Sequence, residues 1–372
     1  MNLSELVQKV DRKRLEATVR HLASYPTRNT LAAGHKQAAE WLVEQYRAIP
    51  GLKVELVEYI LPKGRRVPED RPAFQVLATL PGDSDRCILV GGHLDSLNLQ
   101  IKPDEGPAPG ANDDASGVSV ALECARILAG HRFPLTIHFV AWTGEEQGLN
   151  GSGAMAALAK EKGWKLEAVL SNDTVGSSQN KAGQRDRRRV RVFSAEPGEA
   201  KVASRELARF IEWCTRGVVK SFGPKLVFRQ DRFGRGGDHT PFHRIGFPAV
   251  RLVEVHEEYT RQHTPDDLPQ HMDFGYLANV CRLNLASLFT LAHAGAAPTN
   301  VRVKLDQSHD TTLTWAGDAS TDYVVYWRET TSPTWQGSFE AGHAHEFVIK
   351  GINKDDHIFG VGARSGIPVE AS

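Results

Sequence analysis

The sequence predicts a layered α/β domain with a mostly parallel or mixed sheet, followed by a small all-β sandwich. Over residues 1–295, strand-like apolar runs alternate with segments of helical periodicity, a pattern typical of helices packed on a sheet. After residue 299 the runs become short and alternate between apolar and polar residues, and turn residues separate them about every 8–12 positions. We therefore expect two domains, over 1–295 and 299–372, joined by the linker-like stretch AGAAPTN.

The predicted helices follow from apolar residues spaced three or four positions apart. They cover residues 4–22, 34–48, 116–129, 153–162, 199–215 and 273–293. Apolar runs predict the strands between them. These strands cover residues 53–61, 73–80, 86–91, 135–141, 167–172, 189–194 and 248–253. Because the two types alternate, the helices are expected to cover the faces of the sheet.

The last part of the chain resembles a fibronectin type III module. Trp315 stands where the core tryptophan of an early strand is expected, and Tyr323 and Tyr326 stand in the next strand. The tyrosine corner of such a module would fall at His357, which departs from the pattern. This resemblance implies a β-sandwich over residues 299–372.

Charge and hydropathy exclude several classes of function. Lys plus Arg is 45 and Asp plus Glu is 45, so the formal net charge is zero and a general affinity for nucleic acid or anionic membrane is not expected. No stretch approaches the ~18 consecutive apolar residues of a membrane span. The N-terminal segment is charged and lacks the apolar region of a signal peptide. As it stands the sequence predicts a cytoplasmic protein, or a periplasmic or secreted one if a leader has been removed.

Two further features are expected to be structural. The four cysteines, Cys87, Cys124, Cys214 and Cys281, are scattered and form no Cys-x-x-Cys pair, which argues against a disulfide framework and a thiolate zinc site. Their apolar neighbours predict buried packing thiols. The basic run over residues 185–189 lies in a polar stretch and is predicted to be a solvated surface.

Histidines and carboxylates gather in five short segments that lie near the ends of predicted elements. The segments are GGHLDS (91–96), GANDDASG (110–117), TGEEQG (143–148), SNDT (171–174) and QHTPDD (262–267). In open α/β sheets, ligand sites form at the carboxyl ends of strands. We therefore expect these distant segments to converge on one edge of the sheet.

The residue types in these segments suit a pair of divalent cations. Histidine nitrogen and carboxylate oxygen are ligands of zinc and other borderline ions. Two ions about 3.5–4 Å apart need a bridging carboxylate to offset their repulsion. Two histidines and three acids supply this inventory: His93, Asp113, Glu146, Asp173 and His263. Glu145 remains as a general base, and Asp95 is placed to accept the second ring N–H of His93.

Each segment has an ordinary explanation when it is taken singly. His93 could form a structural hydrogen bond, and Asp113 and Asp114 could form the N-cap of a helix. Asp173 could cap a turn. The Glu145–Glu146 pair is typical of a solvated helix start. The occurrence of all five segments in one order favours a common site.

As a set, these motifs resemble those of the co-catalytic dizinc aminopeptidase family, which includes bacterial leucyl aminopeptidases, glutamate carboxypeptidase II and the glutaminyl cyclases. The resemblance covers residues 10–294 and implies a three-layer αβα zinc-exopeptidase fold with a mixed central sheet. It implies that one zinc binds to His93 and Asp173, that a second binds to Glu146 and His263, and that Asp113 bridges them. It also implies a cis peptide bond between Asp113 and Asp114.

The activity implied by the resemblance is that of an aminopeptidase acting on peptides with a free N-terminus. Glu145 would be the general base and the proton donor to the leaving amine, and Asp95 would support His93. Some family members use a tyrosine to hold the oxyanion, and Gly234 occupies that place here. Arg235, Asp238 and His239 are candidates to line the pocket instead, although this glycine-rich segment is also typical of a loop that caps a helix beginning near Thr240. Phe242, Phe247 and Tyr259 are candidate pocket walls, although aromatic residues near a strand more often belong to the core.

The sequence allows three alternative functions to be weighed against an aminopeptidase. A carboxypeptidase or dipeptidase of the same architecture needs a basic group for the substrate carboxylate, and the candidates are Arg229, Arg232, Arg235 and Arg261. A glutaminyl cyclase usually lacks the full two-metal ligand set, so the intact His93 and the Glu145–Glu146 pair argue against it. A non-catalytic binding protein is disfavoured because the base and all five ligand candidates are present.

Overall fold

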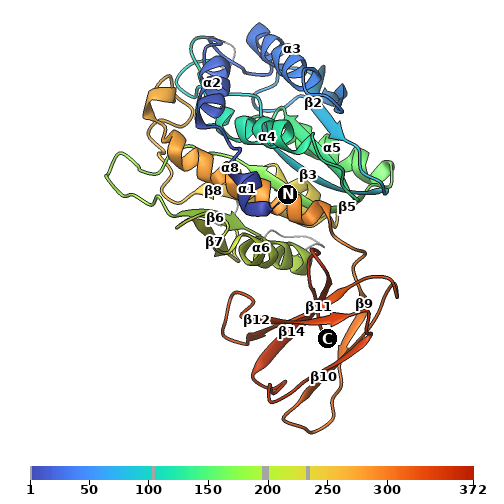
Figure 1. Ribbon diagram of the computed structural model, residues 1–372. Helices are drawn as coiled ribbons and strands as arrows, with labels where there is room; N and C mark the ends of the chain where they lie inside the picture. Colours follow the sequence, from blue (N-terminus) through green and yellow to red (C-terminus); the bar gives the residue numbers. More distant parts are fainter. Residues whose placement is uncertain (1, 103–104, 195–200, 232–234) are drawn as a thin grey trace.

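A mixed β-sheet forms the centre of the larger part of the chain (Figure 1). The computed structural model describes residues 2–102, 105–194, 201–231 and 235–372. The strands of this sheet are β1 (Lys53–Leu61), β2 (Arg71–Leu80), β3 (Arg86–His93), β4 (Thr136–Trp142), β5 (Lys165–Asn172), β6 (Arg189–Phe193), β7 (Gly223–Val227) and β8 (Ala249–Glu254). Within the described residues they pair in the order β1-β2-β4-β3-β5-β8-β6-β7. The neighbours β4, β3, β5 and β8 run parallel, whereas β1, β2 and β6 introduce antiparallel pairs.

Helices cover both faces of this sheet, as predicted. One face carries α1 (Leu3–Val7), α2 (Arg12–Leu22), α3 (Ala33–Arg47), α4 (Ala115–Leu128), α6 (Lys201–Thr215) and α8 (Phe274–Ala292), and the other carries α5 (Asn150–Glu161) and α7 (His239–Arg244). Strand β3 shows the separation of the layers, because successive strand side chains point to opposite faces. Ile88 packs in the core shared with α4 and α8, and Leu89 packs with Met155 of α5 and Phe242 of α7. The three-layer αβα architecture is therefore confirmed.

The predicted elements differ from the structure mainly at one helix and one strand, and α5 also begins at Asn150, three residues before its predicted start. The predicted helix over 4–22 is two helices, because α1 ends at Val7 and Asp11 caps α2 by accepting a hydrogen bond from the Lys13 N–H at 2.8 Å. Strand β7 was not predicted, since its five residues GPKLV include a proline and show no alternation in burial. The seven predicted strands match within two residues at each end.

The C-terminal part consists of two antiparallel sheets that share one core. One sheet pairs β13 (Glu346–Ile349), β10 (Thr311–Ala316) and β9 (Thr299–Val303), and the other pairs β12 (Gly337–Gly342), β11 (Tyr323–Glu329), β14 (His357–Ala363) and β15 (Val369–Glu370). Leu313 and Trp315 of the first sheet pack with Val325 and Phe359 of the second. This packing confirms the predicted all-β sandwich.

Helix α6 lies between the central sheet and the sandwich (Figure 1). The ring of Trp213 on α6 meets Tyr326 of β11 edge-on, with 5.5 Å between centroids. Arg209 Nε donates to the Pro333 carbonyl at 3.0 Å, and Arg216 Nη2 donates to the Trp335 carbonyl at 2.9 Å. These contacts join the two parts through both apolar and polar groups.

A buried glutamate at this junction predicts a pH-dependent stability. Burial raises the pKa of Glu206 to about 7 from an ordinary 4.5, although the adjoining Arg209 lowers it. A carboxyl with a raised folded-state pKa stabilises the fold fully below pH 4.5, and this contribution is lost as the pH rises through 7. The loss is on the order of 3 kcal/mol.

We expect Glu206→Gln to remove that loss. Urea unfolding of the parent and the variant between about pH 4.5 and 8 should give a difference in free energy of unfolding that grows towards pH 7 and then levels off. Glu40→Gln removes an exposed glutamate of α3 and serves as the control. A difference curve for Glu206→Gln that is as flat as the control would contradict the assignment.

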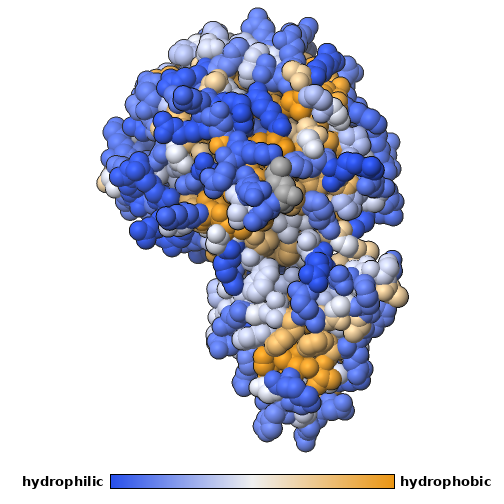
Figure 2. Space-filling model, viewed as in Figure 1, coloured by the Kyte–Doolittle hydropathy of each residue, from blue (hydrophilic) through white to orange (hydrophobic). Residues whose placement is uncertain are grey.

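Most of the cysteines are buried, and the surface of the larger part is mainly hydrophilic in the view shown. Among the described residues, no helix is both long enough and apolar enough to cross a membrane. Cys87, Cys124 and Cys281 are buried free thiols as predicted, whereas Cys214 is only partly buried. Figure 2 shows a mainly hydrophilic face on the larger part and an apolar patch on the sandwich.

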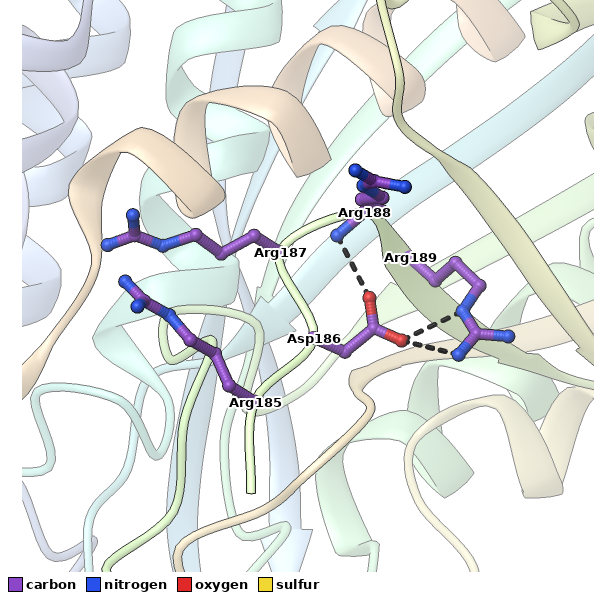
Figure 3. A pocket seen from close by; sticks show the side chains of 5 residues that line it. All are labelled: Arg185, Asp186, Arg187, Arg188 and Arg189. Atoms are coloured by element: carbon purple, nitrogen blue, oxygen red, sulfur yellow. Dashed lines mark hydrogen bonds and ion pairs between the residues drawn. The ribbon is translucent and has the colours of Figure 1, made fainter. Parts of the chain in front are cut away.

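The basic run is a solvated surface, as predicted. Its five residues line a surface depression of about 600 Å³ (Figure 3). The Asp186 carboxylate accepts hydrogen bonds from the Arg188 N–H at 2.9 Å and from Arg189 Nε at 2.8 Å, while Arg185 and Arg187 point away from it. All four arginines are exposed, so their charges are largely screened by solvent.

Candidate metal centre

Parallel strands bring the five candidate ligands to one edge of the sheet. His93 is the last residue of β3, and Asp173 directly follows β5. Glu146 lies four residues after the end of β4, and β4, β3 and β5 are parallel neighbours. Asp113 precedes α4, and His263 lies in the loop between β8 and the 3-10 helix η1 (Pro269–His271). The fold thus places all five side chains together at one edge of the sheet, which is where the sequence predicted that the five segments would converge.

The carboxylate of Asp113 faces both histidines. Its Oδ1 lies 3.1 Å from Nε2 of His93, and its Oδ2 lies 3.2 Å from Nε2 of His263. On the outer sides, Asp173 Oδ1 lies 3.9 Å from His93 Nε2, and Glu146 Oε1 lies 3.0 Å from His263 Nε2. The five donors therefore form two groups that share Asp113, each with one histidine and one further acid.

The charge balance of the two groups calls for cations. Burial disfavours a proton on His263, but Asp113 and Glu146 outweigh it and raise its pKa to about 11. Asp113 and Asp173 likewise raise the pKa of His93 well above its ordinary value against the effect of burial. The carboxylates therefore draw protons onto both histidines, and a divalent cation in each group would replace those protons. The nitrogen and oxygen donors fit zinc, and each group leaves room for a non-protein ligand.

Glu145 lies beside the two groups and is a member of neither. It is partly buried, and its donor atoms lie within 4.8 Å of those of His93 and Glu146. Burial raises the pKa of Glu145 well above its ordinary value; His93 lowers it, and the charges of Glu146 and Asp173 add to the rise. A carboxyl with a raised pKa next to a cation site is suited to accepting and returning a proton.

Asp95 contacts His93 through a different atom from the one predicted. The Asp95 backbone carbonyl lies 3.0 Å from Nδ1 of His93, whereas its carboxylate oxygen is 3.8 Å away. The carboxylate instead accepts hydrogen bonds from the backbone N–H groups of Glu145 at 3.3 Å and Glu146 at 3.1 Å. The turn after β3 brings the carbonyl to the ring, so Asp95 supports His93 with its backbone and the Glu145–Glu146 turn with its side chain.

The backbone around Asp113 is held by two further acids. Asp114 caps α4 by accepting from the Gly117 N–H at 2.9 Å, and its other oxygen accepts from the His93 N–H at 3.0 Å. The peptide bond between Asp113 and Asp114 is cis, as the resemblance implied. Asp267 accepts from the N–H groups of Asn112 and Asp113, both at 2.9 Å. Asp267 stands in the QHTPDD segment, but sequence reasoning did not assign it a role.

Two residues at the centre adopt a left-handed backbone. His263 has φ of 57°, and Thr174, which follows Asp173, has φ of 56°. Such conformations cost of order 1–3 kcal/mol for residues with a Cβ, and surrounding contacts must maintain them. The His263 carbonyl accepts from the Leu99 N–H at 3.0 Å, and the Thr174 N–H donates to Asp114 Oδ1 at 3.2 Å.

The donors open into a cleft of about 260 Å³ with two arginines in its wall. Arg66 Nη1 donates to the Glu146 carbonyl at 2.6 Å, and Arg235 Nη1 lies 2.7 Å from Glu257 Oε2. Gly148, Leu149 and Gly236 complete the lining. Arg66 was not identified from the sequence, because its segment carries no motif and lies 80 positions before Glu146.

The other predicted pocket residues have mixed outcomes. Arg235 lines the cleft, whereas Asp238 and His239 are buried and do not line it. Phe242 and Phe247 pack in the apolar core with α5, the more common place for aromatic residues near a strand, and neither forms a wall of the cleft. The remaining candidates lie outside the cleft lining or outside the described residues. Tyr259 is half-exposed and donates a hydrogen bond to Glu257. Arg261 lines a separate pocket with residues 177–181, and Arg229 does not line the cleft. Arg232 and Gly234 fall outside the described residues.

Comparisons with known proteins bear on the family and on the fold of this chain. Residues 75–288 match the profile of peptidase family M28. A probable zinc metalloprotease of Leptosphaeria maculans is 35% identical over 96% of this chain and 93% of its own length. The solved structure of an aminopeptidase from Aneurinibacillus sp. strain AM-1 superposes with a TM-score of 0.63 at 16% identity, over 79% of this chain and 97% of that chain. A glutaminyl cyclase from Fimbriiglobus ruber superposes with a TM-score of 0.60 at 20% identity, over 74% and 94% of the two chains.

Proposed function

The chain belongs to peptidase family M28 and is a peptidase, and from this we propose that it is a zinc-dependent aminopeptidase with two zinc ions. It would hydrolyse the first peptide bond of peptides that have a free N-terminus. The observation that carries the proposal is the Asp113 carboxylate, whose two oxygens face two histidines 3.1 and 3.2 Å away, with Glu145 beside them.

In this proposal His93 and Asp173 would hold one zinc, Glu146 and His263 would hold the other, and Asp113 would contribute to both. When bound, zinc ions polarise a substrate carbonyl and lower the pKa of water to about 7. Glu145 takes the proton of the attacking water and later gives it to the departing amine nitrogen. Asp95 holds the N–H groups of Glu145 and Glu146, so it positions the base relative to the ligands.

The free α-amine of the substrate is a cation and needs a negative anchor. The cleft supplies four carboxylates, those of Asp113, Glu145, Glu146 and Asp173. An amine that binds among them places the first peptide bond next to Glu145. An N-acetylated peptide lacks this charge, so it is expected to bind and react poorly.

A carboxypeptidase or dipeptidase is the second candidate because Arg66 and Arg235 also line the cleft. A guanidinium forms two parallel hydrogen bonds with a carboxylate and is the usual group for gripping one. A glutaminyl cyclase is the third and weaker candidate, supported by fold likeness only.

The proposed function predicts the outcome of a peptide panel. The zinc-loaded protein is given Leu-, Glu-, Lys- and Gln-headed peptides, each free or N-acetylated and each with a free or amidated C-terminus. We expect cleavage of the first bond, a loss of at least about tenfold in kcat/KM on N-acetylation, which is about 1.4 kcal/mol, and tolerance of C-terminal amidation. Mass spectrometry of the products identifies the bond that is cut.

The same panel separates the alternatives. Cleavage that requires the free C-terminal carboxylate and tolerates N-acetylation would indicate a carboxypeptidase. A requirement for both free termini would indicate a dipeptidase. Loss of ammonia from Gln-headed peptides without chain cleavage would indicate a cyclase.

We further propose that the sandwich is a fibronectin type III-like module. Its division into three and four antiparallel strands supports this, as does the edge-on packing of Trp315 on Tyr323 at 5.7 Å. His357, which stands at the place of the tyrosine corner, is partly buried at the start of β14.

A further inference from the structure

A fully buried arginine lies directly behind one of the proposed zinc ligands. Arg251 is on β8 and has no solvent exposure. Its Nη2 lies 3.0 Å from Oδ2 of Asp173, and the other oxygen of Asp173 is the one that faces His93. We infer that Arg251 is a positioning residue, which holds one oxygen of Asp173 so that the other is presented to the metal.

A carboxylate on its own can rotate and offer either or both oxygens to a cation. An ion pair with a rigid guanidinium removes that freedom, since the planar group is itself fixed by packing and by other partners. Arg251 Nη1 lies 3.0 Å from Asp231 Oδ2 and 3.3 Å from the Gly236 carbonyl. The arginine is therefore anchored through its other terminal nitrogen.

The anchoring extends through a chain of alternating charges towards the surface. Asp231 lies 3.6 Å from Arg235, Arg235 lies 2.7 Å from Glu257, and Glu257 lies 2.5 Å from Arg191. Arg235 and Gly236 also form part of the cleft wall. Arg251, Asp231 and Arg235 thus connect Asp173 to the wall of the cleft beside it, and Arg191 lies at the outer end of the chain of charges.

In the part of the chain that the structure describes, no arginine or lysine forms an ion pair with the carboxylates of the other two acidic ligands, Glu146 and Asp113. Glu146 is contacted by Arg66 at its backbone carbonyl, and Asp113 is held by Asp267 at its backbone N–H. Loss of Arg251 should therefore affect the zinc bound by His93 and Asp173 more than the zinc bound by Glu146 and His263. Groups that orient metal ligands typically change metal affinity by about 10–100-fold when they are replaced.

This inference rests on the proposed zinc centre, and metal binding tests it separately from turnover. Arg251→Lys keeps the positive charge but loses the planar fork, and Arg191→Lys makes the same change at the far end of the network. Each protein is stripped of metal and titrated with zinc in competition with a chromophoric chelator. Thermal unfolding of the metal-free proteins verifies the fold.

We expect the parent and Arg191→Lys to bind two zinc ions with the same pair of affinities. Arg251→Lys should bind one zinc as the parent does and the other about 10–100-fold more weakly. Its kcat should fall at limiting zinc and recover in excess zinc, a rescue that general structural damage would not produce. Arg251→Gln carries no charge into the core and provides a second variant with the same expected pattern.

Unchanged or tighter binding of both zinc ions by the folded Arg251 variants would overturn the inference. Equal weakening of both ions would also overturn it, because the effect would then not pass through Asp173. A parent protein that binds no zinc pair would instead contradict the proposed function.

Discussion

Glu145→Gln should lower kcat by about 10²–10⁴-fold while leaving both zinc ions bound. The amide has the size of the carboxylate but cannot accept the proton of the attacking water or return it to the leaving amine. Glu145→Ala should show the same loss, because the proposed ligand next to it, Glu146, is retained. Zinc content by atomic emission and steady-state kinetics on the best peptide of the panel measure the two effects.

Glu161→Gln is the matched control, since it removes an exposed glutamate at the end of α5. It should keep the kcat of the parent. A Glu145→Gln protein that retains near-normal kcat would remove Glu145 from the proposed role. Loss of zinc from that variant would instead make Glu145 a ligand, a result that its proximity to His93 and Glu146 makes worth measuring.

Asp113→Ala should reduce bound zinc from about two ions to fewer than one per chain and abolish measurable turnover. The reason is geometric: its two oxygens face His93 and His263, so one substitution removes a donor from both groups. His263→Ala removes a donor from one group only and should retain about one zinc. Equilibrium dialysis followed by metal analysis distinguishes these outcomes.

Asp266→Asn is the control for Asp113→Ala, since it changes an exposed aspartate in the same loop as His263. It should leave zinc content and turnover unchanged. Two zinc ions retained by a folded Asp113→Ala protein would show that Asp113 does not bridge them.

Hydrophobic periodicity was sufficient for most of the fold. The seven strands predicted from apolar runs lie within two residues of their observed bounds, and helices cover both sheet faces. Hydrophobic periodicity did not predict the break between α1 and α2, which a helix cap determines, or strand β7, whose alternation is weak. Asp11 starts a new helix inside a continuous apolar periodicity, and β7 shows no alternation in burial.

The location of the candidate centre also followed from the sequence. His93 and Asp173 stand at the carboxyl ends of β3 and β5, and parallel pairing brings such ends together regardless of chain separation. Residue chemistry and motif order were enough to predict the five side chains that the structure brings together. The sequence did not show which oxygen of Asp95 meets His93. The backbone carbonyl and the side-chain carboxylate belong to the same residue, and only the backbone conformation decides which of them faces the ring.

The sequence by itself therefore determined the layered fold, the β-sandwich and the set of residues that meet at the sheet edge, because periodicity and strand direction are local properties of the chain. Only the tertiary structure decided what surrounds those residues. The contacts of Arg251 with Asp173 and of Arg66 with Glu146 join segments about 80 positions apart, and neither arginine lies in a motif. Side chains buried beside a site are selected by packing and charge balance in three dimensions, and these leave no periodic signal in one dimension.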